Sequence, residues 1–271
     1  MASSLGIFFE EYNFNKAKRW LVETEPFLLK AVAFYVIGIW TIKWIQSSRK
    51  PFDLKVPLIL WNAILATFSI LGVIYTTPTW IRVISKHGIS HTYTHVSEMY
   101  TDKVAGYWTF LWVVSKIPEF VDTFFIVLRK KPLMFMHWYH HAFTGYFAFV
   151  TFYSENAYMI WVVWLNYIIH SAMYTYYGLR ACQIRVPPQV AQIITSAQIV
   201  QFLITHLVMA LTAYSAWVVG DKVAVTPYGF FVGAFMEVTY LLLWFQFYYV
   251  SYIRTGGKKY VQHQEKINKS Q

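Results

Sequence analysis

The chain has 271 residues, of which 57% are hydrophobic and only 13% are charged. A soluble domain usually carries about 25% charged residues, so this composition excludes most soluble folds and indicates a polytopic membrane protein. The net charge of +10 does not indicate a nucleic-acid partner, because the basic residues gather between the apolar segments.

Seven apolar segments are long enough to cross a bilayer, which takes roughly 17 to 25 residues each. The first segment carries Lys30 and Lys43 near its ends, where long side chains can reach the membrane interface. We therefore predict an all-α polytopic membrane protein with seven transmembrane helices, at 27–45, 56–77, 107–128, 132–153, 157–179, 189–218 and 228–253.

The loops between these segments differ in their content of Lys and Arg. Basic residues follow the first, third and fifth segments, at Arg49, Lys130 and Arg185 among others, and recur in the C-terminal tail. The alternate loops are poorer in basic residues, although the second one holds three. Cytoplasmic loops carry an excess of Lys and Arg. We predict one domain over 1–271, with a luminal N-terminal segment (1–26) and a cytosolic basic tail (256–271).

With this orientation, the depth of each polar residue follows from the helical rise of about 1.5 Å per residue. His140, His170, Glu119 and Gln198 each lie roughly 13 to 15 Å from the predicted cytosolic end of their segment, and Asp122 lies roughly 10 Å from it. Polar residues at such depth normally face the protein interior and mark functional sites. The sequence therefore predicts a polar chamber that is shared by four helices and reached from the cytosol.

Within each segment the polar residues share one helical face. The stretch HWYHH places His137, His140 and His141 at positions i, i+3 and i+4. The same spacing groups Lys116 and Glu119 on the third segment, with Asp122 next to them, and it also groups Asn166, His170, Tyr174 and Tyr177 on the fifth segment and Gln198 and Gln201 on the sixth.

A structural role for some of these residues stays open. The two acids and the lysine of the third segment could form an ion-pair network that fixes helix packing, and the glutamines could form hydrogen bonds between helices. His206 and Glu237 have no polar neighbours at the same depth, so we interpret them as structural.

The histidines could also hold a metal. An HxxHH pattern occurs in membrane di-iron enzymes, and HTYTH at 91–95 supplies an HxxxH. The charge pattern, however, places HTYTH on the opposite side of the membrane from His140. A mononuclear site remains an alternative, since imidazole suits zinc and iron. We expect no catalytic metal.

Four stretches resemble successive signature segments of the ELOVL family (elongation of very long chain fatty acids). They are KIPEFVDTFFIVLRK, HWYHH, NYIIHSAMYTYYG and QIVQ, which follow the order and spacing of that family. The similarity covers nearly the whole chain, from about Phe52 to Arg254. Trp138 within HWYHH resembles the branch of the family that acts on saturated and monounsaturated acyl-CoA.

The resemblance implies that spans two to seven form a six-helix barrel around a narrow acyl tunnel. It implies a 3-oxoacyl-CoA synthase of the endoplasmic reticulum that condenses a long-chain acyl-CoA with malonyl-CoA, the first step of microsomal fatty acid elongation, without a redox cofactor. Expected partners are these two substrates and membrane lipid, but no nucleic acid; a homodimer and the other elongation-cycle enzymes are further candidates. A di-iron desaturase or hydroxylase and a seven-helix transporter are the rival interpretations.

The chain departs from the family pattern at two places. Many relatives have a cysteine in each of two luminal loops, whereas the single cysteine here, Cys182, lies in a predicted cytosolic loop. Many relatives also have Thr or Ser two places after the histidine box, where this chain has Phe143 and then Thr144. We therefore predict no disulfide and assign no hydroxyl role at that position.

By analogy with the family, His140 is expected to attack the thioester and form an acyl-imidazole, while His170 stabilises the thioester oxygen. His137 and His141 would orient and tune His140. Donors to the enolate would be Asn166, Tyr174 and Gln201. Candidates for charge-assisted contacts to CoA phosphates are Lys130, Lys131, Arg180 and Arg254, although lysines at a membrane surface are usually only orientation signals.

Overall fold

The computed structural model describes residues 6–256, and within this range all regular structure is helical. Apart from Gly256, the predicted basic tail lies outside the described residues. A short 3₁₀ turn at Gly6–Phe8 precedes the helices, which are α1 (Phe14–Ser47), α2 (Lys55–His87), α3 (His91–Thr94), α4 (Glu98–Thr101), α5 (Ala105–Ser115), α6 (Val121–Leu128), α7 (Phe135–Tyr153), α8 (Met159–Ala181), α9 (Pro188–Ala213) and α10 (Pro227–Tyr248).

Four helical segments are long and apolar enough to cross a membrane, which confirms a polytopic membrane protein. They are α1, α2, α9 with its π-helical extension Tyr214–Val219, and α10 with its π-helical extension Tyr249–Arg254. The other three predicted spans coincide with the α5–α6 pair, α7 and α8. Helices α5 and α6 are only 11 and 8 residues long, and the apolar sequences of α7 and α8 are interrupted by His137, His140, His141 and His170.

Helix α1 begins well before the predicted start of the first span. Its N-cap is Asn13, whose side chain accepts a hydrogen bond from the Lys16 amide at 3.0 Å. Such a cap satisfies one of the free amides of the first turn. Residues 14–26, which the sequence had placed in a luminal segment, therefore form the first turns of this 34-residue helix.

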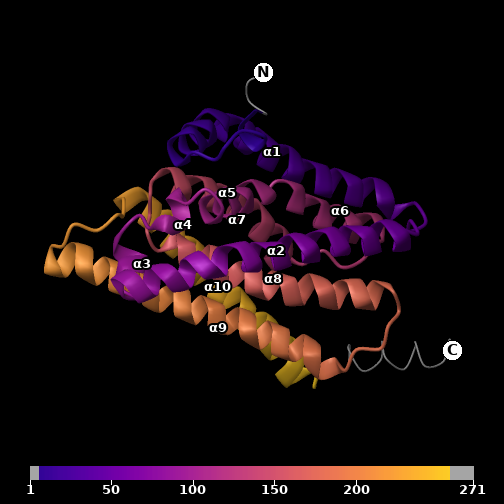
Figure 1. Cartoon of the computed structure of the whole chain (residues 1–271). Helices are drawn as coiled ribbons and strands as arrows, with labels where there is room; N and C mark the ends of the chain where they lie inside the picture. The colour runs from indigo at the N-terminus through magenta and orange to yellow at the C-terminus, as the bar shows by residue number, and fades with distance from the viewer. Residues whose placement is uncertain (1–5, 257–271) are drawn as a thin grey trace.

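The large helices pack as successive neighbours around a common interior (Figure 1). Helix α2 contacts α8 most extensively, α8 contacts α9, α9 contacts α10, α10 contacts α7, α7 contacts α5, and α5 returns to α2. Helix α1 lies outside this series, against α6 and α7. The close contact of α2 with α8 depends on Gly72, where an added Cβ would stand 2.3 Å from the Tyr167 ring.

The third predicted span is interrupted in its middle. Helix α5 ends at Ser115, a 3₁₀ turn covers Pro118–Phe120, and α6 begins at Val121. The break is explained by Pro118, which lacks an amide hydrogen and whose ring conflicts with the preceding turn of an α-helix. The break places Lys116 and Glu119 next to each other in the protein interior.

Hydrogen bonds hold the loops at the end of the molecule that contains α3 and α4. The Tyr100 hydroxyl donates to the Asn156 carbonyl at 2.7 Å, and the Tyr12 hydroxyl donates to the Tyr100 carbonyl at 2.8 Å. The Ala157 amide donates to the Ala224 carbonyl at 2.8 Å. These bonds connect segments that are far apart in the sequence.

Candidate functional site

A cavity of about 480 Å³ lies among the helices. Its lining comes from α2, from α5 to α10 and from the segments at their ends, whereas α1 lies outside. All four predicted catalytic histidines line it. The cavity also brings together these other predicted site residues: Asp122, Asn166, Tyr174, Tyr177, Gln198, Gln201 and Arg180.

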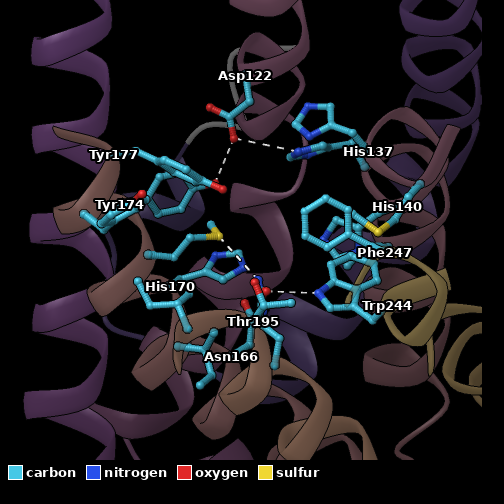
Figure 2. Close-up of a pocket in the computed structure, with 18 of the residues that line it drawn as sticks. Asp122, His137, His140, Asn166, His170, Tyr174, Tyr177, Thr195, Trp244 and Phe247 are labelled. Atoms are coloured by element: carbon cyan, nitrogen blue, oxygen red, sulfur yellow. Dashed lines mark hydrogen bonds and ion pairs between the residues drawn. The ribbon is translucent and has the colours of Figure 1, made fainter. Parts of the chain in front are cut away.

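The histidines of HWYHH lie on one face of α7, as their spacing predicts. The rings of His137 and His141 are 4.6 Å apart, and those of His140 and His141 are 5.4 Å apart. Figure 2 shows His137 and His140 on one side of the cavity, with His170, Tyr174 and Tyr177 on the other. Two helices, α7 and α8, thus present imidazoles to the same space.

His140 is held by two aromatic residues of α10 and by a hydroxyl of its own helix. Its ring lies 4.8 Å from the Tyr240 ring and 5.3 Å from the Trp244 ring. The Tyr240 hydroxyl donates to the His140 carbonyl at 2.9 Å and lies 2.8 Å from the Thr144 hydroxyl. The Thr144 Oγ1 is 3.4 Å from Nδ1 of His140. Because the Tyr240 hydroxyl donates its proton to the His140 carbonyl, the Thr144 hydroxyl donates to Tyr240 and its oxygen can accept from Nδ1–H, which leaves the Nε2 lone pair available.

Asp122 connects three helices next to the histidines. Its Oδ1 accepts a hydrogen bond from the Trp61 indole at 2.5 Å, and its Oδ2 accepts one from the Tyr174 hydroxyl at 2.8 Å. The same Oδ2 lies 3.8 Å from Nε2 of His141. A carboxylate with these neighbours can orient an imidazole, as second-sphere acids do elsewhere.

Lys116 and Glu119 lie behind the cavity lining rather than on it. The Lys116 ammonium donates to Oε1 of Glu119 at 2.6 Å, and the Ser115 hydroxyl donates to the same oxygen at 2.9 Å. The ammonium also lies 4.5 Å from the Trp112 ring centroid. The structure therefore contains an ion pair of the kind expected if these residues only fix helix packing. Both side chains lie at the break between α5 and α6.

The amide side chains of α8 and α9 link helices and line the cavity at the same time. The Trp112 indole donates to Oδ1 of Asn166 at 2.8 Å, and the Trp244 indole donates to Oε1 of Gln198 at 3.0 Å. Gln201 lines the cavity close to them. The interhelical bonds expected of the glutamines are thus present for Gln198, and the amides still contribute polar groups to the cavity.

Of the basic residues predicted to bind CoA phosphates, only one lines the cavity. Arg180 lines the cavity, whereas Lys130, Lys131 and Arg254 are not part of its lining. The Lys130 ammonium instead donates to the Ser47 carbonyl at 3.1 Å and also to the Arg49 carbonyl. Arg129, which was not among the predicted residues, lines the cavity together with Arg180.

Sequence reasoning also missed several lining residues, namely Trp112, Thr144, Glu237, Tyr240 and Trp244. Of these, Thr144 carries a detectable signal, because it stands four residues after His140 and so lies on the same helical face. The aromatic residues look like ordinary membrane-span residues in the sequence. Tyr240 and Trp244 reach the cavity because α10 packs against α7, and this contact cannot be inferred from spacing along one helix.

The second histidine pattern lies outside the cavity. The rings of His87, His91 and His95 stack in sequence with centroids 4.5 Å apart. Desolvation lowers the pKa of His91, as does the neighbouring charge of His95 and His87. Within residues 6–256 no group of three or more His, Cys, Asp or Glu side chains is arranged to hold a metal ion.

Buried imidazoles, an acid, amides and phenols that share one cavity can supply a nucleophile, a proton donor and hydrogen bonds to a developing oxyanion. These features define a polytopic membrane enzyme.

Comparison with known proteins identifies its family. The chain belongs to the ELO: GNS1/SUR4 family, which matches residues 20–260. It is 41% identical over 230 residues to long chain fatty acid elongase 1 of Caenorhabditis elegans, covering 85% of this chain and 80% of the relative. It is 33% identical to human very long chain fatty acid elongase 6, covering 91% of this chain and 92% of the relative, and 32% identical to the Drosophila melanogaster elongase of the same name, covering 93% and 80%.

Proposed function

We propose that the cavity condenses a long-chain acyl-CoA with malonyl-CoA through an acyl-imidazole on His140. The chain is a fatty acid elongase, the 3-oxoacyl-CoA synthase that carries out the condensing step of microsomal elongation. Its family implies acyl-CoA and malonyl-CoA as substrates. The observation that carries the proposed mechanism is the placement of His140 in the cavity, with Thr144 beside Nδ1.

In the first half-reaction Nε2 of His140 attacks the thioester carbonyl. A carbon–nitrogen bond replaces the carbon–sulfur bond, and the CoA thiolate leaves with the proton that the imidazole gives up. Because His170 lines the cavity from α8, opposite α7, it is suited to stabilise the thioester oxygen as negative charge develops. Asp122 and His137 would fix the positions of His141 and, through it, His140.

In the second half-reaction malonyl-CoA loses carbon dioxide and leaves an enolate. The enolate carbon attacks the acyl-imidazole carbonyl, so a carbon–carbon bond forms, the carbon–nitrogen bond breaks and His140 takes up a proton. Asn166, Tyr174 and Gln201 are placed in the lining where they could donate hydrogen bonds to the enolate oxygen. The arginine pair Arg129 and Arg180 is suited to CoA phosphates by charge-assisted, bidentate contacts.

We also propose that the single domain crosses the endoplasmic-reticulum membrane seven times, with the N-terminus luminal and the C-terminus cytosolic. Six spans, all except α1, would form a barrel around the acyl cavity. This proposal is supported by the order in which these helices contact one another and by their shared contribution to the lining. The similarity to the elongases numbered 6 and the presence of Trp138 favour saturated and monounsaturated acyl-CoA. A homodimer and contacts with other elongation-cycle enzymes stay predictions.

A pre-steady-state assay tests the mechanism. Purified protein mixed with acyl-CoA alone should release CoA in a burst of about one equivalent, because the first half-reaction needs no malonyl-CoA. His140→Gln should abolish this burst and the condensation. His170→Gln should slow CoA release by about 10² to 10³, the usual effect of losing one oxyanion donor.

The matched control is His95→Gln, which makes the same change at an exposed histidine outside the cavity and should leave the burst intact. Intact-protein mass spectrometry should detect the acyl adduct on the wild type. If the wild type elongates but releases CoA only after malonyl-CoA is added, the covalent mechanism is wrong and condensation is direct.

A further inference from the structure

The four Asn and Gln side chains of the cavity lining differ in which atom they present to the interior. Asn62 donates its amide nitrogen to a backbone carbonyl at 2.7 Å, so its oxygen is the free atom. In Gln198 both amide atoms have partners within the described chain. Gln201 contributes only its backbone carbonyl to a side-chain hydrogen bond within residues 6–256. Asn166 alone among these four combines a bonded oxygen with a nitrogen that has no partner in the described chain.

The oxygen of the Asn166 amide is fixed by Trp112. The Trp112 indole on α5 donates to Oδ1 of Asn166 at 2.8 Å, and both residues line the cavity. An indole N–H can donate but not accept, so the oxygen of the amide and not its nitrogen has to face it. A hydrogen bond to the carbonyl oxygen also polarises the amide and strengthens its N–H groups as donors. Trp112 therefore decides which end of this amide the cavity contents meet.

The nitrogen of the Asn166 amide is open to the cavity. Among the described residues four side-chain nitrogen or oxygen atoms are fully buried without a partner, and Nδ2 of Asn166 is not one of them. Because Asn166 is a buried residue that lines the cavity, the accessible area of this nitrogen belongs to the cavity wall. Asn166 lies four residues before His170, one turn away on the same face of α8 (Figure 2). Its two N–H groups are thus available beside the proposed site of chemistry.

Trp112 itself has little freedom to move. It is 1% exposed, and the Lys116 ammonium lies 4.5 Å from its ring centroid. The ammonium is held in turn by Glu119 at 2.6 Å. A cation over the face of an indole is attracted by the ring quadrupole, and more strongly where water is absent. The ion pair behind the cavity lining thus holds the indole that orients the amide.

We propose that Trp112 is a positioning residue for the condensation step, which turns the Asn166 amide so that it presents only N–H donors to the enolate oxygen of decarboxylated malonyl-CoA. This inference rests on the proposed function, because the enolate forms in the same cavity. An enolate oxygen carries negative charge and accepts hydrogen bonds, whereas an amide oxygen in the same place would repel it. Without the indole the amide can rotate, and in one of its two orientations the oxygen faces the enolate.

Two substitutions of Trp112 separate its N–H group from its volume. Trp112→Phe fills much of the space of the indole but has no donor, and it should lower kcat about tenfold, the effect of one buried hydrogen bond, without a change in KM for malonyl-CoA. Trp112→His fills less space, but its imidazole takes the place of the five-membered ring with Nε2 at the position of the indole nitrogen, so it should recover most of the loss. A role in packing alone predicts the opposite order, and that order would overturn the inference.

The two half-reactions provide a further readout. All Trp112 variants should release CoA from acyl-CoA alone at the wild-type rate, because the enolate appears only after malonyl-CoA binds. Quenched-flow samples analysed by mass spectrometry give both rates. The matched control is Trp164→Phe, which removes an indole that donates to the Thr77 hydroxyl at 3.0 Å outside the cavity lining, and it should leave both rates unchanged. A burst slowed as much as condensation in Trp112→Phe would contradict a role confined to the enolate.

A double-mutant cycle tests whether Trp112 acts through Asn166. Asn166→Leu should slow condensation by about 10² to 10³, the usual effect of losing one oxyanion donor. In that background Trp112→Phe should cause no further loss, because the amide that it orients is gone. A further tenfold loss would show that Trp112 acts by another route and would overturn the inference.

The wild-type enzyme separates failure of this inference from failure of the proposed function. If the wild type condenses the two substrates and Trp112→Phe does so at the same rate, only this inference is wrong. If the wild type releases CoA only after malonyl-CoA is added, the covalent step is wrong, and the order of kcat for Trp112→Phe and Trp112→His still decides the role of the indole. If no 3-oxoacyl product forms, the proposed function fails and this inference fails with it.

Discussion

The environment of His140 depends on two hydroxyl groups that the HWYHH pattern does not include. Thr144 and Tyr240 bond to each other, one lies beside Nδ1 of His140, and the other bonds to its backbone carbonyl. This arrangement fixes the ring from two helices. It also places a hydroxyl near the imidazole although the chain lacks one two positions after the histidine box.

Removal of either hydroxyl should slow acyl transfer to His140. Thr144→Val and Tyr240→Phe should each lower the rate of the CoA burst about tenfold with little change in KM, because each leaves a buried hydrogen-bonding partner unsatisfied, which costs roughly 1 to 3 kcal/mol. The double variant should lose less than the sum of the two losses, since the residues share a bond. Stopped-flow detection of free CoA measures these rates.

Thr151→Val is the matched control, because Thr151 lies on the same helix and its hydroxyl bonds to the Phe147 carbonyl away from the cavity. Its burst rate should equal that of the wild type. Strict additivity of the Thr144 and Tyr240 effects would contradict a shared role in holding His140.

At the scale of helices, the contact between α2 and α8 is the most extensive in the described chain and allows little extra volume. Gly72 faces the Tyr167 ring, which is fully buried and whose hydroxyl donates to the Trp108 carbonyl at 2.8 Å. A methyl group at position 72 would stand 2.3 Å from this ring. The ring cannot move without loss of that hydrogen bond.

Gly72→Ala should therefore destabilise the protein by about 1 to 3 kcal/mol, the usual cost of overpacking. Thermal unfolding in detergent, followed by circular dichroism, measures this loss. Gly178→Ala, on the α8 side of the same contact, is the control, since its Cβ would meet Asn62 at an ordinary 3.6 Å. Alanine raises helix propensity, so Gly178→Ala should leave the melting temperature unchanged or raise it. Equal melting temperatures for the two variants would contradict the packing argument.

The sequence predicted the helical segments of the third to seventh spans and the histidine face of α7, because both depend on local spacing. It did not predict the break at Pro118, since a proline inside an apolar segment is compatible with either a kink or an end. The early start of α1 was missed because residues 14–26 are too polar to be read as part of a membrane span.

The candidate site was predictable where residues share a helix and less so where helices meet. Spacing grouped His137, His140 and His141 correctly, but it could not show that Tyr240 of α10 would reach His140. Glu237 was interpreted as structural because its own helix offers no polar neighbour at the same depth. Its partner Thr205 lies on α9, which the sequence alone could not pair with α10.

For the whole molecule, the proposed orientation can be tested with its single cysteine. Cys182 is exposed in the loop between α8 and α9, which the basic residues assign to the cytosol. In sealed microsomes a membrane-impermeant maleimide should label it without detergent. In the Cys182→Ser background, a cysteine introduced by Asp221→Cys, in the loop before α10, should be labelled only after permeabilisation. The reverse pattern would invert the orientation and place the arginine pair on the luminal side.

The histidine box and the lining residues of α9 and α10 lie on different helices, and this affects how such enzymes can diverge. HWYHH belongs entirely to α7, whereas Gln201, Phe202 and Met236 line the same cavity from α9 and α10. A duplicated gene can therefore change the groups that the acyl chain meets by single substitutions on α9 or α10, while its histidines stay as they are. New substrate ranges can arise in this architecture without passing through an inactive ancestor.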